Sequence, residues 1–211
     1  MIIHCITSGP LETNGYLLVD EKTNEAILID APYKSFKGFV SIINQSNLKL
    51  TTLLLTHSHL DHIADAACFV KKHPELKVWI HQEDAKNLQK PGSDGIPLFF
   101  PIDPVSHYDL FDEGTAFSFC SEPFFVLHTP GHSPGSVCFF FPKQEVLFSG
   151  DTLFKSSIGT LSLPTSEPDR MWSSLKKLEV LPKSTKVYPG HGNPTTIGNE
   201  KWLKNPKEYL G

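Results

Sequence analysis

Four short, aromatic-rich segments in the middle of the chain restrict the possible folds most strongly. They are TAFSFC (115–120), FFVLH (124–128), SVCFFF (136–141) and EVLFSG (145–150), with turn residues between them. Apolar segments of this length and spacing predict an antiparallel meander. A doubly wound parallel sheet needs a crossover between neighbouring strands, so this part of the chain argues against that fold.

The first 90 residues show strand-like segments and helix-like segments in turn. Strands are predicted at IIHCI (2–6), YLLV (16–19), AILID (26–30), LTTLLLT (50–56) and KVWIH (77–81). Apolar residues at helical spacing predict a helix over 35–45, with Ser35 as its N-cap, and one helix over 60–72 that ends before Pro74. A short helix is expected after the KVWIH strand.

The rest of the chain gives the second half of the same arrangement. Residues 91–107 hold four prolines and two glycines and are predicted to form a surface loop. Ser166 is expected to cap a helix that runs to about Val180, followed by a final strand at KVYP (186–189) and a short helix over 197–203. Two sheets packed face to face, with helices outside, would bury both apolar faces, which predicts an α+β sandwich. A length of 211 residues suits one domain spanning residues 1–211.

Charge and composition exclude several classes of function. The net charge is −4 and Arg170 is the only arginine, whereas a nucleic-acid groove normally carries a cationic stripe. No run of about 18 apolar residues exists to span a membrane, and the first residues do not resemble a signal peptide. The four cysteines form no CxxC pair and are expected to be free thiols, which favours a cytoplasmic protein.

Residues 56–62 (THSHLDH) carry four metal-type donors between a predicted buried strand and a predicted helix. Because side chains i and i+2 of an extended chain point the same way, His57 and His59 can share one metal ion. Asp61 and His62 lie at the start of the helix and can reach a second ion beside the first. Imidazole and carboxylate groups are ligands of zinc-type sites.

Three further loops, each directly after a predicted strand, present a histidine or an aspartate. They contain GHSPGS (131–136) with His132, SGD (149–151) with Asp151, and PGHG (189–192) with His191. A carboxylate placed as Asp151 is can bridge two cations with its two oxygens. The three loops and the first motif together form a coherent set.

This series of motifs, in this order and over nearly the whole chain, resembles the metallo-β-lactamase-fold hydrolases. It is most similar to the short, glyoxalase II (hydroxyacylglutathione hydrolase)-like branch. The resemblance implies a four-layer αββα sandwich, with one metal ion on His57, His59 and His132, a second on Asp61, His62 and His191, and Asp151 bridging the two. His128 is interpreted as a supporting or structural residue. The remaining histidines are interpreted as ordinary core or surface residues: His4, His73, His81 and His107.

The resemblance further implies two divalent metal ions as cofactors, zinc first, with iron or manganese as alternatives. Two such ions can hold a shared hydroxide that attacks the carbonyl carbon of a thioester such as S-lactoylglutathione. Asp61 would both bind metal and orient the hydroxide, which makes it the expected catalytic residue. The expected partner is thus a small-molecule thioester, with no nucleic acid and no membrane, and the oligomeric state is left open.

The expected substrate-binding residues are Lys155 and Thr160, and here the sequence departs from the family. Glyoxalase II relatives carry a glycine and then a basic residue that helps to hold a glutathione carboxylate. This chain reads GTLSLP (159–164), with Thr160 in place of Arg or Lys. A neutral hydroxyl cannot form a charge-assisted pair with a carboxylate. The chain also ends soon after His191, without the helical C-terminal domain of full-length glyoxalase II. Both departures weaken the expectation of glutathione recognition more than that of hydrolysis.

Other functions remain as alternatives. One is a mononuclear iron persulfide dioxygenase of the same fold, and another is a non-catalytic metal-binding protein. A lactonase is disfavoured because Phe154 stands where such relatives have a tyrosine, and a β-lactamase because those enzymes lack the bridging aspartate. A nuclease of this fold would need a basic face.

Overall fold

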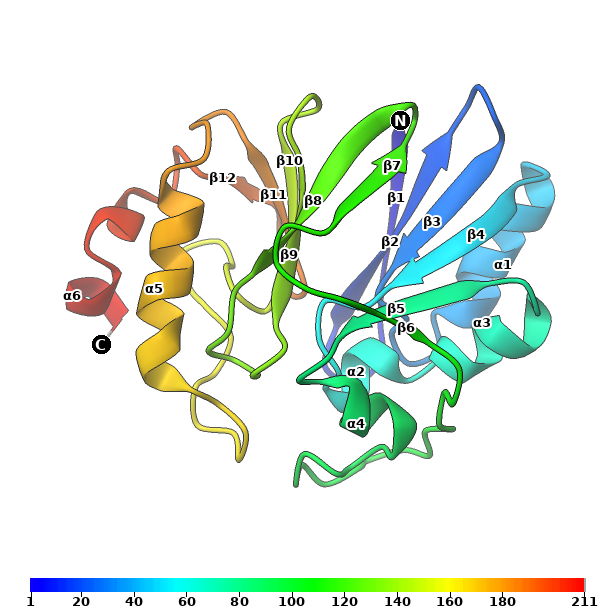
Figure 1. Cartoon of the computed structure of the whole chain (residues 1–211), viewed down its shortest axis with the longest axis horizontal. Coiled ribbons are helices and arrows are strands. Elements are labelled where there is room, and N and C mark those ends of the chain that lie inside the picture. The colour runs from blue at the N-terminus through cyan, green and yellow to red at the C-terminus, as the bar shows by residue number, and fades with distance from the viewer. Residues whose placement is uncertain (211) are drawn as a thin grey trace.

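The computed structural model describes residues 1–210 and shows two six-stranded sheets packed against each other (Figure 1). The first sheet has the strand order β1-β2-β3-β4-β5-β6. Its strands are β1 (Ile2–Ser8), β2 (Thr13–Asp20), β3 (Glu25–Ile29), β4 (Lys49–Leu54), β5 (Lys77–His81) and β6 (Asp109–Phe111). Strands β1 to β3 are antiparallel and β3 to β6 are parallel. The five strands predicted in this half are confirmed, and only the three-residue β6 was not predicted.

The second sheet has the order β12-β11-β10-β9-β8-β7. Its strands are β7 (Ala116–Phe119), β8 (Glu122–His128), β9 (Val137–Phe141), β10 (Val146–Gly150), β11 (Lys186–Pro189) and β12 (Thr195–Thr196). The predicted antiparallel meander is confirmed in β7 to β10, and β11 joins β10 in parallel after a helical crossover. KVYP is not the final strand, because two further residues form β12 against it.

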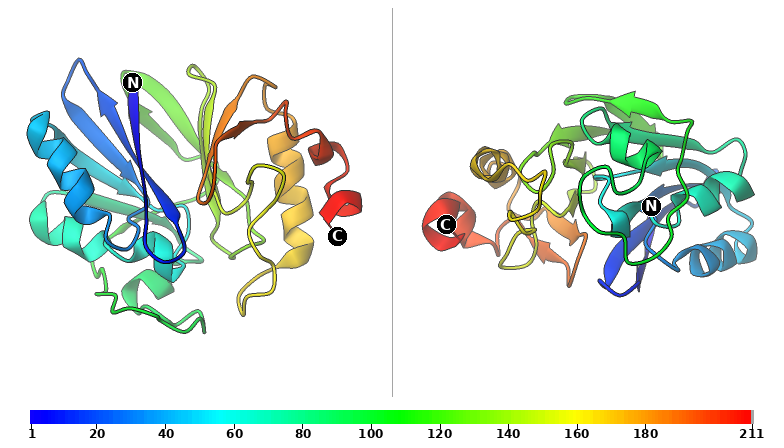
Figure 2. Two further views of the ribbon diagram at one scale, coloured as in Figure 1. Left: turned by 180° about the vertical axis from the view of Figure 1, so that it is seen from behind. Right: turned by 90° about the horizontal axis from the view of Figure 1, so that it is seen from below.

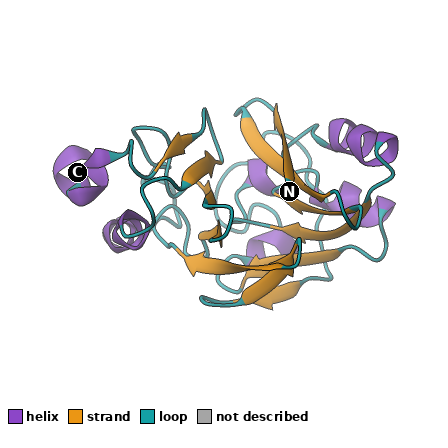
Figure 3. Cartoon of the chain, turned by 90° about the horizontal axis from the view of Figure 1, so that it is seen from above, coloured by secondary structure: helices purple, strands orange, loops and turns teal. Residues whose placement is uncertain are grey.

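Helices cover the outer faces of the two sheets (Figures 2 and 3). On the first side they are α1 (Phe36–Gln45), α2 (Leu60–Ile63), α3 (Ala66–Lys72) and α4 (Ala85–Gln89). On the second side they are α5 (Pro168–Glu179), the 3-10 turn η1 (Lys201–Lys204) and α6 (Pro206–Leu210). The predicted four-layer sandwich is therefore confirmed. Among residues 1–210, no helix has both the length and the apolar composition that crossing a membrane requires.

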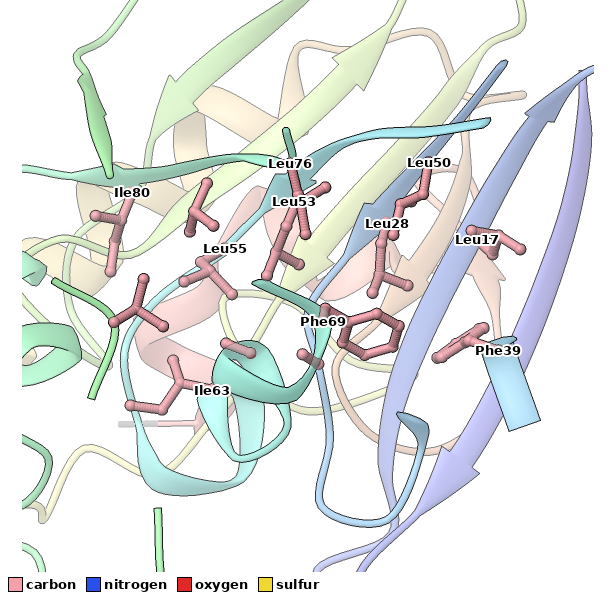
Figure 4. Close-up of a cluster of buried hydrophobic side chains, with 14 of the residues drawn as sticks. Leu17, Leu28, Phe39, Leu50, Leu53, Leu55, Ile63, Phe69, Leu76 and Ile80 are labelled. Atoms are coloured by element: carbon pink, nitrogen blue, oxygen red, sulfur yellow. The ribbon is translucent and has the colours of Figure 1, made fainter. Parts of the chain in front are cut away.

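Alternation along the strands divides the core into layers. In β2, Leu17 and Val19 face the outer helices, whereas Tyr16 and Leu18 face the second sheet. The outer cluster of the first sheet, with Leu53 and Phe69 near its middle, is shown in Figure 4. The layer between the sheets is rich in aromatic rings supplied by the meander. The four phenylalanine-rich segments thus hold the two sheets together.

The prediction of one continuous helix over 60–72 is wrong, because this segment forms two separate helices, α2 and α3. At the break, the backbone N–H of Asp65 donates to the carbonyl of Ala31 at 2.9 Å, and the N–H of Ala31 donates to the carbonyl of His62 at 2.8 Å. The chain after β3 therefore takes up hydrogen bonds that a continuous helix would make within itself.

Of the two predicted helix caps, the first is confirmed in position. Ser35 is the N-cap residue of α1, but its side chain makes no capping hydrogen bond, and Asp65 accepts the N–H of Phe36 at 2.8 Å instead. Helix α5 begins at Pro168 with Glu167 as N-cap, so Ser166 is not the cap. The short helix predicted over 197–203 begins only at residue 201. Contacts distant in sequence engage both sites, since Asp65 accepts the N–H of Phe36 and the Ser166 hydroxyl donates to the carbonyl of His132 at 2.9 Å. Sequence patterns report only neighbours along the chain.

We expect Phe139→Ala to lower the free energy of unfolding by about 3–5 kcal/mol. Phe139 is fully buried between the sheets and packs edge-on against Phe111 and Phe124. Urea unfolding measures the effect. The control is Phe99→Ala, since Phe99 is 68% exposed and its loss should change stability by about 0.5 kcal/mol or less. Equal effects of the two changes would contradict this account of the core.

Candidate metal centre

The seven metal-type residues of the sequence motifs meet at one edge of the sandwich. His57 and His59 follow β4, Asp61 and His62 lie on α2, and the other three residues come from loops of the second sheet. Those three are His132 between β8 and β9, Asp151 directly after β10, and His191, which Gly190 separates from β11. Each sheet therefore supplies part of the cluster, and neither sheet holds a complete set.

The first group consists of His57, His59 and His132. One ring nitrogen from each lies within 4.8 Å of the others, and all three residues are buried. The Nδ1 atom of His59 lies 2.8 Å from Nε2 of His132. The structure thus brings together the three histidines that the family resemblance assigns to one ion.

The second group consists of Asp61, His62 and His191, again with ligand atoms within 4.8 Å of one another. The Oδ2 atom of Asp61 lies 3.5 Å from Nε2 of His62 and 3.3 Å from Nε2 of His191. Asp61 and His62 are buried, whereas the side chain of His191 is partly exposed. This group matches the second set that the resemblance implies.

Asp151 lies between the two groups. Its Oδ1 atom is 3.3 Å from Nε2 of His62, and its Oδ2 atom is 3.3 Å from Nε2 of His132 and 3.4 Å from Nε2 of His191. The carboxylate therefore faces ligands of both groups. This is the geometry expected of a bridging carboxylate.

The polar atoms of the cluster fit a bound cation. Within residues 1–210, the buried atoms His57 Nε2, His62 Nε2 and Asp151 Oδ1 have no hydrogen-bond partner. Buried polar atoms without partners cost free energy, and metal ligation would satisfy all three. Nitrogen and carboxylate donors suit zinc, iron and manganese. The residues present therefore fit a divalent metal centre.

Hydrogen bonds fix the orientation of two rings from the first sheet side. The Nδ1 atom of His62 lies 2.7 Å from Oδ2 of Asp30, a buried carboxylate that also accepts the backbone N–H of Thr56 at 2.8 Å. The hydroxyl of Thr56 contacts Nδ1 of His57 at 3.1 Å. Engaging Nδ1 in this way turns Nε2 of each ring toward the cluster, as outer hydrogen bonds do for metal-ligating histidines.

Backbone carbonyls fix two further rings. Nδ1 of His132 donates to the carbonyl of Thr160 at 2.8 Å, and Nδ1 of His191 donates to the carbonyl of Leu11 at 2.9 Å. These donors again leave Nε2 facing the cluster. Thr160, which the sequence predicts to touch substrate, thus also contributes its backbone to the orientation of His132.

Electrostatics favour the protonation states of metal ligands at several positions. Burial, with the neighbouring His62 and His59, lowers the pKa of His57 well below its usual value, so that ring is neutral. Burial alone would raise the pKa of Asp151, but His62, His191 and His132 around it hold that pKa well below the usual range. Neutral imidazole and ionised carboxylate are the forms that bind metal.

His191 behaves differently from His57. Burial would lower its pKa, but hydrogen bonds to Asp151 and Asp61 raise the pKa to about 9. A cation placed between these two carboxylates would compete with that proton.

Asp84 is a further residue of the site region that the motifs do not reveal. Its buried carboxylate accepts the backbone N–H of Ser58 at 2.8 Å, that of Gly135 at 2.8 Å and the hydroxyl of Ser133 at 2.9 Å. It therefore ties the first motif, on one sheet, to the loop of His132 on the other. A lone aspartate after the KVWIH strand gives no sequence signal for this role.

The other histidines lie apart from the seven-residue cluster. The ring of His128 stacks on His81 with centroids 4.1 Å apart and contacts the carbonyl of Pro134 through Nε2 at 2.8 Å, and its structural role stays a prediction. His107 is exposed, and His4 and His73 are partly exposed. Of the two residues predicted to bind substrate, Thr160 lines the cavity beside the cluster, whereas Lys155 is exposed and outside that lining.

We expect Asp84→Ala to lower the free energy of unfolding by about 2–4 kcal/mol, because it leaves two buried N–H groups unpaired. It should also weaken metal binding by about 10- to 100-fold, since the two ligand loops lose their shared anchor. Urea unfolding of the metal-free protein and a metal titration measure the two effects. The control is Asp112→Ala, whose carboxyl side chain is 69% exposed. Parent-like stability and metal affinity in Asp84→Ala would refute this role.

Comparison with known proteins identifies the family of the chain. The family model of the metallo-beta-lactamase superfamily matches residues 8–191. The chain is 33% identical to the hydroxyacylglutathione hydrolase GloC of Haemophilus influenzae, over 95% of each chain. Its structure is similar to that of the B3 metallo-beta-lactamase BLEG-1, with a TM-score of 0.88 and 31% identity over 100% of both chains. It is also similar to the di-iron-bound form of TTHA1623, with a TM-score of 0.80 and 35% identity over 93% of this chain and 96% of that one. The chain therefore belongs to the metallo-β-lactamase superfamily.

Proposed function

We propose that this chain is a binuclear metal-dependent hydrolase that cleaves small acyl thioesters. The observation that carries the proposal is the position of Asp151, whose two oxygens face histidines of both groups. Such an arrangement suits two ions about 3.5–4 Å apart, the spacing of two-metal hydrolases. The similarity to a hydroxyacylglutathione hydrolase supports the choice of a thioester.

In this proposal, the ligands divide as the two groups do. His57, His59 and His132 would hold one ion, Asp61, His62 and His191 the other, and Asp151 would contact both. Two divalent cations, when bound, lower the pKa of water and polarise a substrate carbonyl. Zinc is the proposed metal, and the di-iron form of the relative TTHA1623 supports iron as an alternative.

Asp61 is the proposed catalytic residue of the chain itself. Burial would raise its pKa, but His62 and a hydrogen bond from His191 lower that pKa to about 2, so the group is a carboxylate at neutral pH. The hydroxyl of Thr13 donates to its Oδ2 atom at 2.6 Å and fixes its orientation. An ionised carboxylate held in this way can accept a hydrogen bond from an attacking water and orient it.

The remaining chemistry requires little from other side chains. The leaving group of a thioester is a thiolate of low pKa, so no strong general acid is needed. A cysteine nucleophile is not required either, and the buried Cys138 is unsuited to that role because burial raises its pKa to about 11. All four cysteines are free, which supports the proposal that the protein works in the reducing cytoplasm.

A second candidate is hydrolysis of a β-lactam, and the full-length similarity to BLEG-1 favours it. The two reactions differ in the leaving group, since an amide nitrogen needs a proton that a thiolate does not. We favour the thioester because a thiolate leaves without a proton and because the similarity to the hydroxyacylglutathione hydrolase GloC covers 95% of both chains.

We expect His57→Ala and Asp151→Ala each to lose bound metal and to reduce thioester hydrolysis to the background rate of buffer. Each change removes a donor that no neighbouring side chain replaces. Elemental analysis and a thiol-release assay measure the two effects. The control is His107→Ala, an exposed histidine far from the motifs in sequence, which should keep both properties. Retained hydrolysis in either His57→Ala or Asp151→Ala would contradict the proposal.

A substrate panel separates the candidate functions. The metal-loaded protein is given simple acyl thioesters, S-lactoylglutathione, a chromogenic β-lactam and, with an oxygen electrode, glutathione persulfide. Thiol release from thioesters supports the proposal. Three outcomes would contradict it. Turnover of only the β-lactam would indicate a β-lactamase, and oxygen uptake with a single bound iron would indicate a persulfide dioxygenase. Metal binding without any turnover would indicate a non-catalytic protein.

A further inference from the structure

A cavity of about 520 Å³ opens directly over the candidate metal centre. Its floor contains five of the candidate ligands: His59, Asp61, His132, Asp151 and His191. Its walls are largely apolar and come from segments far apart in sequence: Leu11, Leu60, Ile96, Phe99, Phe154 and Leu163. A substrate whose carbonyl lies at the metal ligands must therefore place part of itself against apolar surface.

The cavity offers little to a charged substrate. Among the described residues that line it, none is a lysine or an arginine, and the polar groups beyond the candidate ligands reduce to Thr160. The Thr160 hydroxyl already forms a 2.9 Å hydrogen bond with that of Ser162. An anionic group such as a glutathione carboxylate would lose water here without gaining a charged partner.

The proline-rich segment 91–107 forms one wall of this cavity. Phe100 anchors the segment, because it is buried and its ring stacks on Tyr33 with centroids 4.1 Å apart. Phe100 also packs with Leu60 at the start of α2. The adjacent Phe99 lies on the cavity wall and remains 68% exposed. Covering a large water-exposed ring with an apolar ligand stabilises the complex, because it removes apolar surface from water.

A smaller cavity on the other side of His59 does not supply the missing cation. It measures about 220 Å³ and contains Lys86, but its lining also includes Glu83, Asp84 and Asp94. Three acidic residues beside one lysine disfavour an anion. Neither cavity at the candidate centre therefore presents a net positive surface.

We propose that the 520 Å³ cavity binds an uncharged, apolar arm of the thioester, so that the enzyme prefers such thioesters to the glutathione thioester. The inference rests on the proposed function, because the arm is placed by a carbonyl at the metal ligands. The apolar arm can be the acyl chain or the thiol portion, and the shared chemistry is an alkyl or aryl group that covers Phe99, Ile96 and Leu163.

Two series of thioesters test this inference and separate the two arms. The first lengthens the acyl chain on N-acetylcysteamine from acetyl to octanoyl, and the second lengthens the S-alkyl group of thioacetates. We expect kcat/KM to rise about fourfold per methylene in one series, the equivalent of about 0.8 kcal/mol, until the cavity is full. S-Lactoylglutathione should be a poorer substrate than the best member. A flat response in both series would overturn the inference.

Binding is measured independently of turnover with non-hydrolysable S-alkyl thioethers of N-acetylcysteamine by calorimetry. Longer alkyl groups should bind more tightly, and Phe99→Ser should reduce this gain several-fold. The matched control is Val180→Ser, since Val180 is an apolar residue 77% exposed and outside the cavity lining. Chain-length-dependent binding without hydrolysis of any thioester would refute the proposed function, but it would support the binding of an apolar group in the cavity. Hydrolysis with no dependence on chain length in either assay would refute the cavity's role alone.

Discussion

The buried carboxylate of Asp151, held against histidines from both sheets, is the interaction on which the candidate centre depends. A carboxylate removed from water is costly unless it is paired, and here its partners come from three separate segments. The backbone must approach it closely. A Cβ atom at Gly190 would overlap the Oδ1 atom of Asp151 and lie 2.8 Å from Cε1 of His62. Glycine at this position is therefore required by space and not by turn geometry.

The stability of the sandwich and the formation of the site are linked. Asp84 joins the two ligand loops, and Tyr16, on the inner face of β2, donates its hydroxyl to the carbonyl of Pro189 at 2.6 Å. The side chain of Asn14 donates to the same carbonyl at 3.0 Å and to that of Gly192 at 3.0 Å. These bonds hold the loop of His191, on the second sheet, against the first. The aromatic layer between the sheets sets the distance that they span.

Local patterns predicted much of this molecule. The meander, the strand before THSHLDH and the strands before Asp151 and His191 all follow from apolar runs and turn residues. Spacing alone paired His57 with His59 and Asp61 with His62, and the resemblance to the family implied the rest of the seven residues that the structure brings together. What local patterns missed depends on contacts distant in sequence. At the break between α2 and α3 the backbone bonds to Ala31, the N–H of Phe36 at the start of α1 donates to Asp65, and Asp84 anchors two loops. None of these residues carries a local signal for its role.

The cavity could not be predicted from the sequence for a related reason. One of its walls is formed by segment 91–107, which has neither helical nor strand periodicity and is anchored by Phe100 stacking against Tyr33 from a distant part of the chain. The sequence did show that Thr160 replaces a basic residue. The structure adds that this position borders a cavity whose walls are largely apolar.

The most direct test of a two-metal centre is the location of metal in crystals of the zinc-loaded protein, measured by anomalous scattering at the zinc edge. We expect two peaks about 3.5–4 Å apart, one beside His57, His59 and His132 and the other beside Asp61, His62 and His191, with Asp151 contacting both. A single peak with the second group of ligands left unbound at saturating zinc would contradict it.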